Sequence, residues 1–261
     1  MAAGAKKMVF STLARFGYRV VRVDNSTRLG YRLVRIDRGP TYGLECLFPM
    51  LKRLGFAPKH VVDVGANHGR WTRTAIEYFP DACYTLVEPQ DGLKVDVQDL
   101  IDAGRKIRWV NAGAGDRPGV LPFTICERDD ASNFTISEQD ARAAGLRRID
   151  VPVRTLDEIV SSSNLPIPDM VKIDAEGFDL KVLAGAGSLM GKTEIFFVEA
   201  GVFGDRENSV LRVMQWMSDK GYSLLDLTEL NRSPKFGVLW LMELAFLRNA
   251  SRLLEGAGSY E

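Results

Sequence analysis

The stretch His60-Val-Val-Asp-Val-Gly-Ala-Asn-His-Gly69 decides the fold. Its β-branched residues Val61, Val62 and Val64 predict a short buried strand. The glycines that follow predict a turn, and the apolar spacing of residues 71–79 predicts a helix. A strand, a glycine turn and a helix in this order form the nucleotide-binding corner of an open α/β sheet.

The spacing of the turn distinguishes between ligands. Dinucleotide-binding folds carry G-x-G-x-x-G, whereas this turn has Gly65 and Gly69 in G-x-x-x-G. Asp63 lies before the first glycine, where a carboxylate would repel a pyrophosphate. S-adenosylmethionine carries a sulfonium and an ammonium but no phosphate, so an acid here favours it. The corner is interpreted as a methyl-donor site, and its candidate cofactor-binding residues are Asp63, Gly65, Ala66, Asn67 and Gly69.

Strands and helices alternate from about residue 58 onward. Further strands are predicted at residues 84–88, 107–111, 170–174, 194–199, 222–227 and within 238–248. The alternation predicts an α/β fold with a doubly wound, seven-stranded, mostly parallel, Rossmann-like sheet. Residues 117–155 interrupt it with two proline-containing edge strands, so we expect a β-hairpin insertion there. The predicted domains are an N-terminal cap at 1–57 and a catalytic domain at 58–261.

The composition is that of an ordinary globular protein, with 46% apolar residues and 34 each of acidic and basic residues. The basic residues gather near the N-terminus, because residues 1–40 hold nine cations and two acids. Their arginines are spaced among Leu, Val and Tyr, which favours a folded cap. A contact with an anionic membrane surface and a wall of the acceptor pocket stay open as interpretations. No recognised module supports nucleic-acid binding, so none is expected.

The cysteines indicate the compartment. Cys46, Cys83 and Cys126 lack the spacing of a zinc site, and their number is odd. A reduced, cytoplasmic setting is therefore expected. The longest apolar run, near residues 238–247, is too short for a membrane span and contains Glu243. The sequence makes no prediction about the oligomeric state.

Polar residues recur where the predicted strands end. Glu88 ends the second strand, 23 positions after Gly65, where an acid can accept hydrogen bonds from both ribose hydroxyls. NAD-binding folds share this feature, and a solvated carboxylate is the alternative without a ligand. Asn111 and Ala112 end the third strand and are expected beside the adenine. All three residues join the predicted cofactor site. His60 precedes its strand and is expected at the surface.

Acids at the later strand ends are the candidates for catalysis. Asp174 and Glu176 lie in Lys172-Ile-Asp-Ala-Glu-Gly177, and Glu199 ends the next strand. Positioning can supply about 7–11 kcal/mol of the barrier to methyl transfer onto a hydroxyl, and a general base typically contributes ~10²–10⁴-fold. Asp174, Glu176 and Glu199 are therefore predicted to be catalytic, and His68, inside the turn, is a further candidate base. A divalent metal such as Mg²⁺ on these acids is the less favoured alternative, and no metal ligand is assigned.

Three segments together resemble the FkbM-type methyltransferases, a branch of the class I S-adenosylmethionine-dependent fold. They are residues 62–69 with Thr72, residues 111–116 with Gly119 and Phe123, and residues 169–177 with Val182, Leu183 and Gly185. The resemblance covers about residues 58–201, continues more weakly to Arg248, and does not cover residues 1–57. The ending at Leu239–Leu244 is longer than usual, so the resemblance does not specify the acceptor-side loop around residues 229–236.

The resemblance implies O-methylation of a hydroxyl on a sugar, glycolipid or polyketide-type natural product. It implies that Asp63, Gly65, Asn67 and Glu88 hold the cofactor. It also implies that Asp174 and Glu176 face the transfer site. The expected partner is a small-molecule or glycan acceptor that the resemblance does not specify. Two alternatives stay open, a Rossmann-type NAD oxidoreductase and an S-adenosylmethionine-binding module without turnover.

Overall fold

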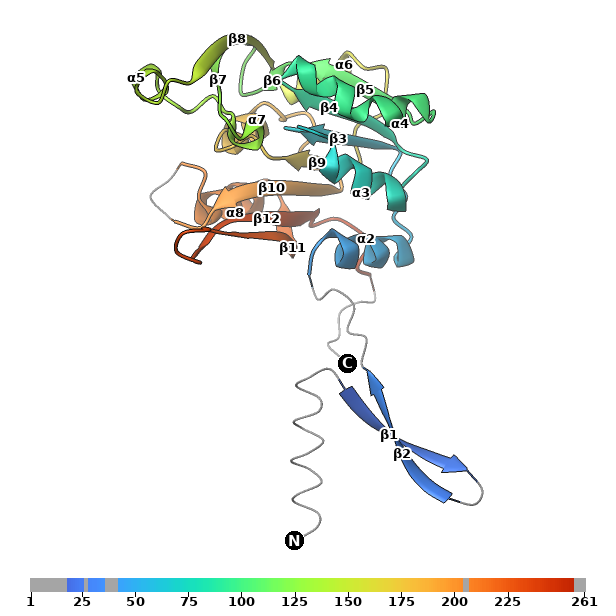
Figure 1. Cartoon of the computed structure of the whole chain (residues 1–261). Coiled ribbons are helices and arrows are strands. Elements are labelled where there is room, and N and C mark those ends of the chain that lie inside the picture. The colour runs from blue at the N-terminus through green and yellow to red at the C-terminus, as the bar shows by residue number, and fades with distance from the viewer. Residues whose placement is uncertain (1–17, 26–27, 36–41, 204–206, 256–261) are drawn as a thin grey trace. The chain divides into compact units, whose positions relative to one another are not determined.

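The structure is a computed structural model that describes residues 18–25, 28–35, 42–203 and 207–255. The chain divides into two units, residues 1–41 and residues 42–261, and each is described by itself. In the first unit, β1 (Tyr18–Asn25) pairs antiparallel with β2 (Arg28–Arg35) (Figure 1). The cationic side chains of residues 1–40, and the membrane contact considered for them, lie outside what the structure describes.

A seven-stranded sheet forms the centre of the second unit (Figure 1). Its strands are β3 (His60–Val64), β4 (Cys83–Glu88), β5 (Ile107–Asn111), β9 (Met170–Ile173), β10 (Ile195–Gly201), β11 (Tyr222–Arg232) and β12 (Leu239–Arg248). The order is β11-β12-β10-β9-β3-β4-β5, and in this sheet β12 alone runs in the direction opposite to the other six strands. The predicted seven-stranded, mostly parallel sheet is therefore confirmed.

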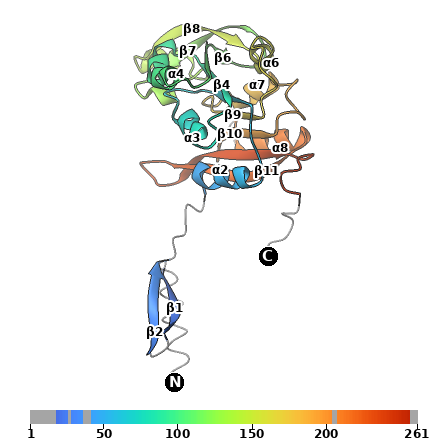
Figure 2. The same cartoon turned by 90° about the vertical axis from the view of Figure 1, so that its right-hand side faces the viewer.

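Helices cover both faces of the sheet, as a doubly wound fold requires (Figure 2). One face packs against α2 (Leu44–Arg53), α3 (Arg70–Tyr78), η1 (Asp91–Val97) and α4 (Gln98–Asp102). The other packs against α6 (Leu156–Ser161), α7 (Asp179–Ala184) and α8 (Val210–Asp219). A capping box of Thr155 and Glu158 opens α6.

The predicted insertion forms a small sheet of its own. Here β7 (Gly119–Ile125) pairs antiparallel with β8 (Arg147–Arg154), and the short β6 (Gly113–Ala114) pairs with the other edge of β8. Between β7 and β8 lie η2 (Asp129–Ala131) and α5 (Glu138–Ala143). The hairpin expected within residues 117–155 is confirmed, and β6 adds a third strand to it.

Helix α2 moves the boundary predicted at residue 57. Phe48 on α2 is fully buried and makes edge-on or tilted ring contacts with Trp71, Tyr78, Phe79 and Phe197. These rings come from α3, its C-terminal end and β10. Residues 42–57 therefore belong to the unit of the large sheet, and the smaller unit ends at residue 41.

His60 was expected at the surface, and this expectation is wrong. The side chain is fully buried, with Nδ1 2.7 Å from the Pro166 carbonyl oxygen and Nε2 2.9 Å from Thr85 Oγ1. Two polar partners make its burial possible, which the apolar neighbours in sequence do not indicate. Within the described ranges, no helix combines the length and the apolar character needed to cross a membrane.

Candidate active site

Strand alternation places the charged residues on one face of the sheet. Successive side chains of a strand point to opposite faces, so residues two apart share a face. The apolar residues Val61, Met170, Phe197 and Ala245 belong to the core beneath α2 and α3. Each strand has its next residue on this face two positions nearer to the carboxyl edge of the parallel strands. These next residues are charged, and they are Asp63, Lys172, Glu199 and Glu243. Asp63 is in register with Lys172, and Glu199 with Glu243, so charges replace apolar side chains along this edge.

A cavity of about 360 Å³ opens at this edge. Its volume lies within the roughly 300–1,000 Å³ typical of small-ligand sites. Eight of the predicted site residues line it, namely Gly65, Ala66, Asn67, His68, Glu88, Ala112, Asp174 and Glu176. The other four, Asp63, Gly69, Asn111 and Glu199, are not among its lining residues. Most of the predicted site residues therefore border one cavity, but Asp63, from which the cofactor was inferred, does not.

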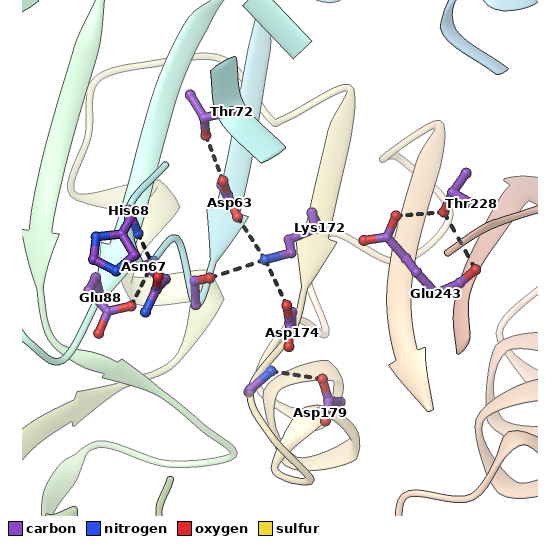
Figure 3. Close-up of polar contacts among 12 residues, drawn as sticks. Asp63, Asn67, His68, Thr72, Glu88, Lys172, Asp174, Asp179, Thr228 and Glu243 are labelled. Carbon is purple, nitrogen blue, oxygen red and sulfur yellow. Dashed lines mark hydrogen bonds and ion pairs between the residues drawn. The ribbon is translucent and has the colours of Figure 1, made fainter. Parts of the chain in front are cut away.

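Glu88 is held in place by the glycine turn. Its Oε2 accepts a hydrogen bond from the backbone N–H of Asn67 at 2.9 Å (Figure 3). Its Oε1 accepts one from Gln90 N–H at 2.9 Å. Burial raises the pKa of Glu88, and the two backbone hydrogen bonds oppose this shift. The alternative of a solvated carboxylate is excluded, because Glu88 is buried.

Asp63 lies behind the turn rather than in the cavity. It is fully buried, its Oδ2 accepts a hydrogen bond from Thr72 Oγ1 at 2.6 Å, and its Oδ1 lies 3.3 Å from Lys172 Nζ (Figure 3). The predicted direct contact with a cofactor is therefore corrected. The physical reason is the alternation of β3, which turns Asp63 towards α3, where Thr72 lies.

Lys172 is the functional residue that the sequence interpretation missed. Its Nζ donates to the carbonyl oxygen of Gly65 at 3.1 Å and lies 3.3 Å from Asp63 Oδ1 and 3.2 Å from Asp174 Oδ2. Burial alone lowers the pKa of Lys172, but the charges of Asp174, Asp63 and Glu243 raise it overall. The signal was available, since a parallel strand of a doubly wound sheet is covered on both faces, so the lysine in Met-Val-Lys-Ile-Asp points into the protein.

The structure brings the three predicted catalytic acids together. One carboxylate oxygen each from Asp174, Glu176 and Glu199 lies within 4.8 Å of the others. Glu176 adopts a positive φ of 49°, a conformation that costs free energy in a non-glycine residue and is typical of functional loops. Burial raises the pKa of Glu176 to about 8, and the neighbouring charges of Asp174 and Asp179 add to the effect. Burial and the same neighbouring carboxylates raise the pKa of Glu199 as well.

Two further buried acids border this group. Asp179 accepts hydrogen bonds from the N–H groups of Ala175 and Gly177 and from Asn208 Nδ2, so it fixes the loop that carries Asp174 and Glu176. Burial raises the pKa of Asp179 to about 7. Glu243 accepts a hydrogen bond from Thr228 Oγ1 (Figure 3), and burial raises its pKa to about 7. Glu243 lines the cavity and was not predicted.

The remaining predicted residues have other contacts. His68 lines the cavity, and its Nδ1 lies 2.7 Å from Asp96 Oδ2, which orients the ring. Asn111 is exposed and donates through Nδ2 to the carbonyl oxygens of Glu88 and Pro89, so it fixes the end of β4. Gly69 has a φ of 70°, and a Cβ there would collide with Val97. These residues shape the turn and the strand end that border the cavity.

Comparison with known proteins places this geometry in a family. The profile of the methyltransferase FkbM domain matches residues 63–224. The 2-O-methyltransferase NoeI of Sinorhizobium fredii (strain NBRC 101917 / NGR234) is 24% identical over 175 residues, which cover 62% of this chain and 71% of that protein.

Two solved structures are similar to this chain at low sequence identity. The methyltransferase FkbM from Methylobacillus flagellatus KT matches with a TM-score of 0.48 and 17% identity, over 71% of this chain and 43% of that one. The chain thus spans less than half the length of that protein. The precorrin-6y C5,15-methyltransferase from Geobacter metallireducens GS-15 matches with a TM-score of 0.43 and 13% identity, over 77% of this chain and 85% of that one.

Proposed function

Because the chain belongs to the FkbM methyltransferase family, we propose that it methylates a hydroxyl group of a sugar, glycoconjugate or natural product. The family makes it an S-adenosylmethionine-dependent methyltransferase and decides against the NAD oxidoreductase alternative. A relative that is named a 2-O-methyltransferase supports oxygen as the acceptor atom. The observation that carries the proposal is a cavity with a fixed carboxylate, Glu88, on the side of the glycine turn and with Asp174 and Glu176 among its other lining residues.

The residues of the cavity fit S-adenosylmethionine. The Glu88 carboxylate keeps acceptor positions beyond its two backbone hydrogen bonds, and ribose hydroxyls can use them. Carboxylates at the cavity wall favour the positive charges of the donor and disfavour a phosphate. Ala112 and Gly113 add small apolar groups to the cavity lining beside the end of β5, which suits a flat base. We therefore assign the donor to the turn, Glu88 and Ala112.

The remaining lining residues serve the acceptor. When bound, S-adenosylmethionine supplies a methyl group on a sulfonium, which is a good leaving group. Asp174 and Glu176 hold the acceptor hydroxyl, and one of these carboxylates accepts its proton as the oxygen bonds to the methyl carbon and the carbon–sulfur bond breaks. Lys172 contacts both Asp174 and the Gly65 carbonyl oxygen. It therefore keeps the distance between the donor turn and the acceptor-binding acids constant.

Binding of S-adenosylhomocysteine tests the donor assignment. A ligand at about 100 times its Kd stabilises a protein by roughly 2.7 kcal/mol, so the melting temperature should rise. Glu88→Ala should abolish this rise, whereas Glu77→Gln, an exposed acid on α3, should keep it. Stabilisation by NAD instead of S-adenosylhomocysteine would refute the proposal.

An acceptor screen tests the transfer itself. The chain is incubated with methyl-labelled S-adenosylmethionine and a panel of sugars, glycolipids and polyketide alcohols, and labelled products are identified by mass spectrometry. Transfer to a hydroxyl is the expected result. Cofactor binding without transfer to any hydroxyl would favour the binding module that lacks turnover. The cytoplasmic location and a role of the N-terminal 41 residues at the acceptor or a membrane surface stay predictions.

A further inference from the structure

Three carboxylates converge at the carboxyl edge of β9 and β10. The register of these parallel strands ends with Val198 opposite Ile173, so the next residues, Glu199 and Asp174, are neighbours. Glu176 reaches the same place from the loop, and the three donor oxygens lie within 4.8 Å of one another. We infer that Asp174, Glu176 and Glu199 bind a hard divalent cation, Mg²⁺ or Mn²⁺, through their carboxylate oxygens.

Glu199 provides a second, separate observation. It is only 9% exposed, and within the described part of the chain its carboxylate accepts no hydrogen bond and forms no ion pair. Burying a charged group without a partner is costly, and buried acids are normally paired. The other buried acids here follow that rule, since Asp63 has Thr72 and Lys172. A cation between Glu199 and its two neighbouring carboxylates would supply the missing partner.

The cations already present do not complete the cluster. Lys172 has three N–H donors, and Nζ already lies within 3.3 Å of the Gly65 carbonyl, Asp63 and Asp174. Arg128, whose charge also acts on Glu176, pairs with Asp130 at 3.0 Å. The carboxylates of Glu176 and Glu199 are therefore left without a positive charge at contact distance within the described ranges.

The proposed ligands suit a catalytic cation. Mg²⁺ prefers carboxylate oxygens and usually keeps positions for water or substrate. Asp174 and Glu176 line the cavity, so a cation there would have an open side towards the acceptor. The role of this cation rests on the proposed function: it would lower the pKa of the acceptor hydroxyl. The hydroxyl proton would still pass to a carboxylate of the cluster as the oxygen takes the methyl group.

Manganese binding tests the inference without the donor or an acceptor. The full chain is stripped with EDTA and titrated with MnCl₂, and free Mn²⁺ is followed by electron paramagnetic resonance. We expect one Mn²⁺ per chain, displaced by Mg²⁺. Asp174→Asn and Glu199→Gln should each weaken binding by at least the ~10–100-fold that loss of an outer-shell partner costs. Glu138→Gln, on the exposed helix α5, is the matched control and should not change it.

Two results would overturn the inference. One is the absence of saturable Mn²⁺ binding to the folded wild-type chain at millimolar concentrations. The other is a Mn²⁺ affinity that is unchanged in both Glu199→Gln and Glu176→Gln. Glu176 lies in a loop, so its substitution keeps the sheet intact. If these variants bound S-adenosylhomocysteine more weakly but Mn²⁺ as well as the wild type does, the acids would bind the methyl donor instead of a cation. Failure of the wild type to bind S-adenosylhomocysteine would refute the proposed function separately.

Discussion

Replacing Lys172 by Met should strongly reduce the free energy of unfolding. The Lys172 side chain is 5% exposed, and its ammonium lies 3.3 Å from Asp63, which is fully buried, and 3.2 Å from the partly exposed Asp174. Methionine keeps the length of the side chain but removes the charge and all three N–H donors. Asp63 then keeps only its hydrogen bond from Thr72, and its charge has no counter-charge at contact distance.

The expected loss follows from the burial of the pair. Removing one partner of a buried ion pair costs about 3–5 kcal/mol, because the other charge stays buried. Folded domains are stable by only about 5–15 kcal/mol, so Lys172→Met should lower the free energy of unfolding by a large fraction. Adding Asp63→Asn removes the uncompensated charge. The double variant should therefore be more stable than Lys172→Met by about 1–3 kcal/mol, within the range of coupled neighbours.

Urea unfolding near neutral pH measures these differences. The four members of the cycle are followed by circular dichroism, with Lys94→Met, an exposed lysine in η1, as the control. The control should stay within about 0.5 kcal/mol of the wild type. The reasoning is refuted if Lys172→Met matches the control, or if Asp63→Asn destabilises the Lys172→Met background as much as it destabilises the wild type.

Three further changes test other parts of the structure. Gly65→Ala should abolish S-adenosylhomocysteine binding in a calorimetric titration, because φ is 70° and a Cβ would collide with the Asp174 carbonyl oxygen; unchanged affinity would contradict this. Phe48→Ala should lower the free energy of unfolding by about 3–5 kcal/mol in urea, and a loss under about 1 kcal/mol would mean that α2 is not part of the core. Burial lowers the pKa of His60, so the unfolded state binds the proton more tightly. Stability should therefore fall as the pH drops below about 6.5, with a smaller slope in His60→Gln, and equal slopes would exclude His60 as the cause.

The sequence predicts strands better than it predicts burial of polar residues. The β-branched and aromatic runs at residues 60–64 and 195–198 give strands β3 and β10 at nearly the expected bounds. The local sequence pattern is sufficient to predict these strands, because short runs of β-branched and aromatic residues are typical of buried strands. His60 and Asp63 belong to the same run, yet their partners Pro166, Thr85 and Thr72 lie elsewhere in the chain. No local pattern shows such partners.

The convergence of the acids depends on strand order. Asp174 and Glu199 are predicted at the ends of successive strands, but they meet only because β9 and β10 are neighbours in the sheet. Glu243 joins them through β12, whose antiparallel insertion next to β10 brings it into register with Glu199. Alternation alone gives the face of each residue, and the tertiary arrangement decides which residues become neighbours. The face of Lys172 was therefore predictable, and its contact with the Gly65 carbonyl was not.

The core and the site share the same strands, and this ties their geometries together. Phe197 packs against Phe48 on α2 and Trp71 on α3, and Glu199 follows it on the same face of β10. A strand cannot move one of these side chains without the other, because the pleat fixes their spacing. The aromatic contacts of α2 therefore hold the part of β10 that carries Glu199, and the pairing of β10 with β9 sets its position relative to Asp174. This explains why a helix outside the region matched by the family profile contributes to the site: it holds the face of the sheet from which the acids project.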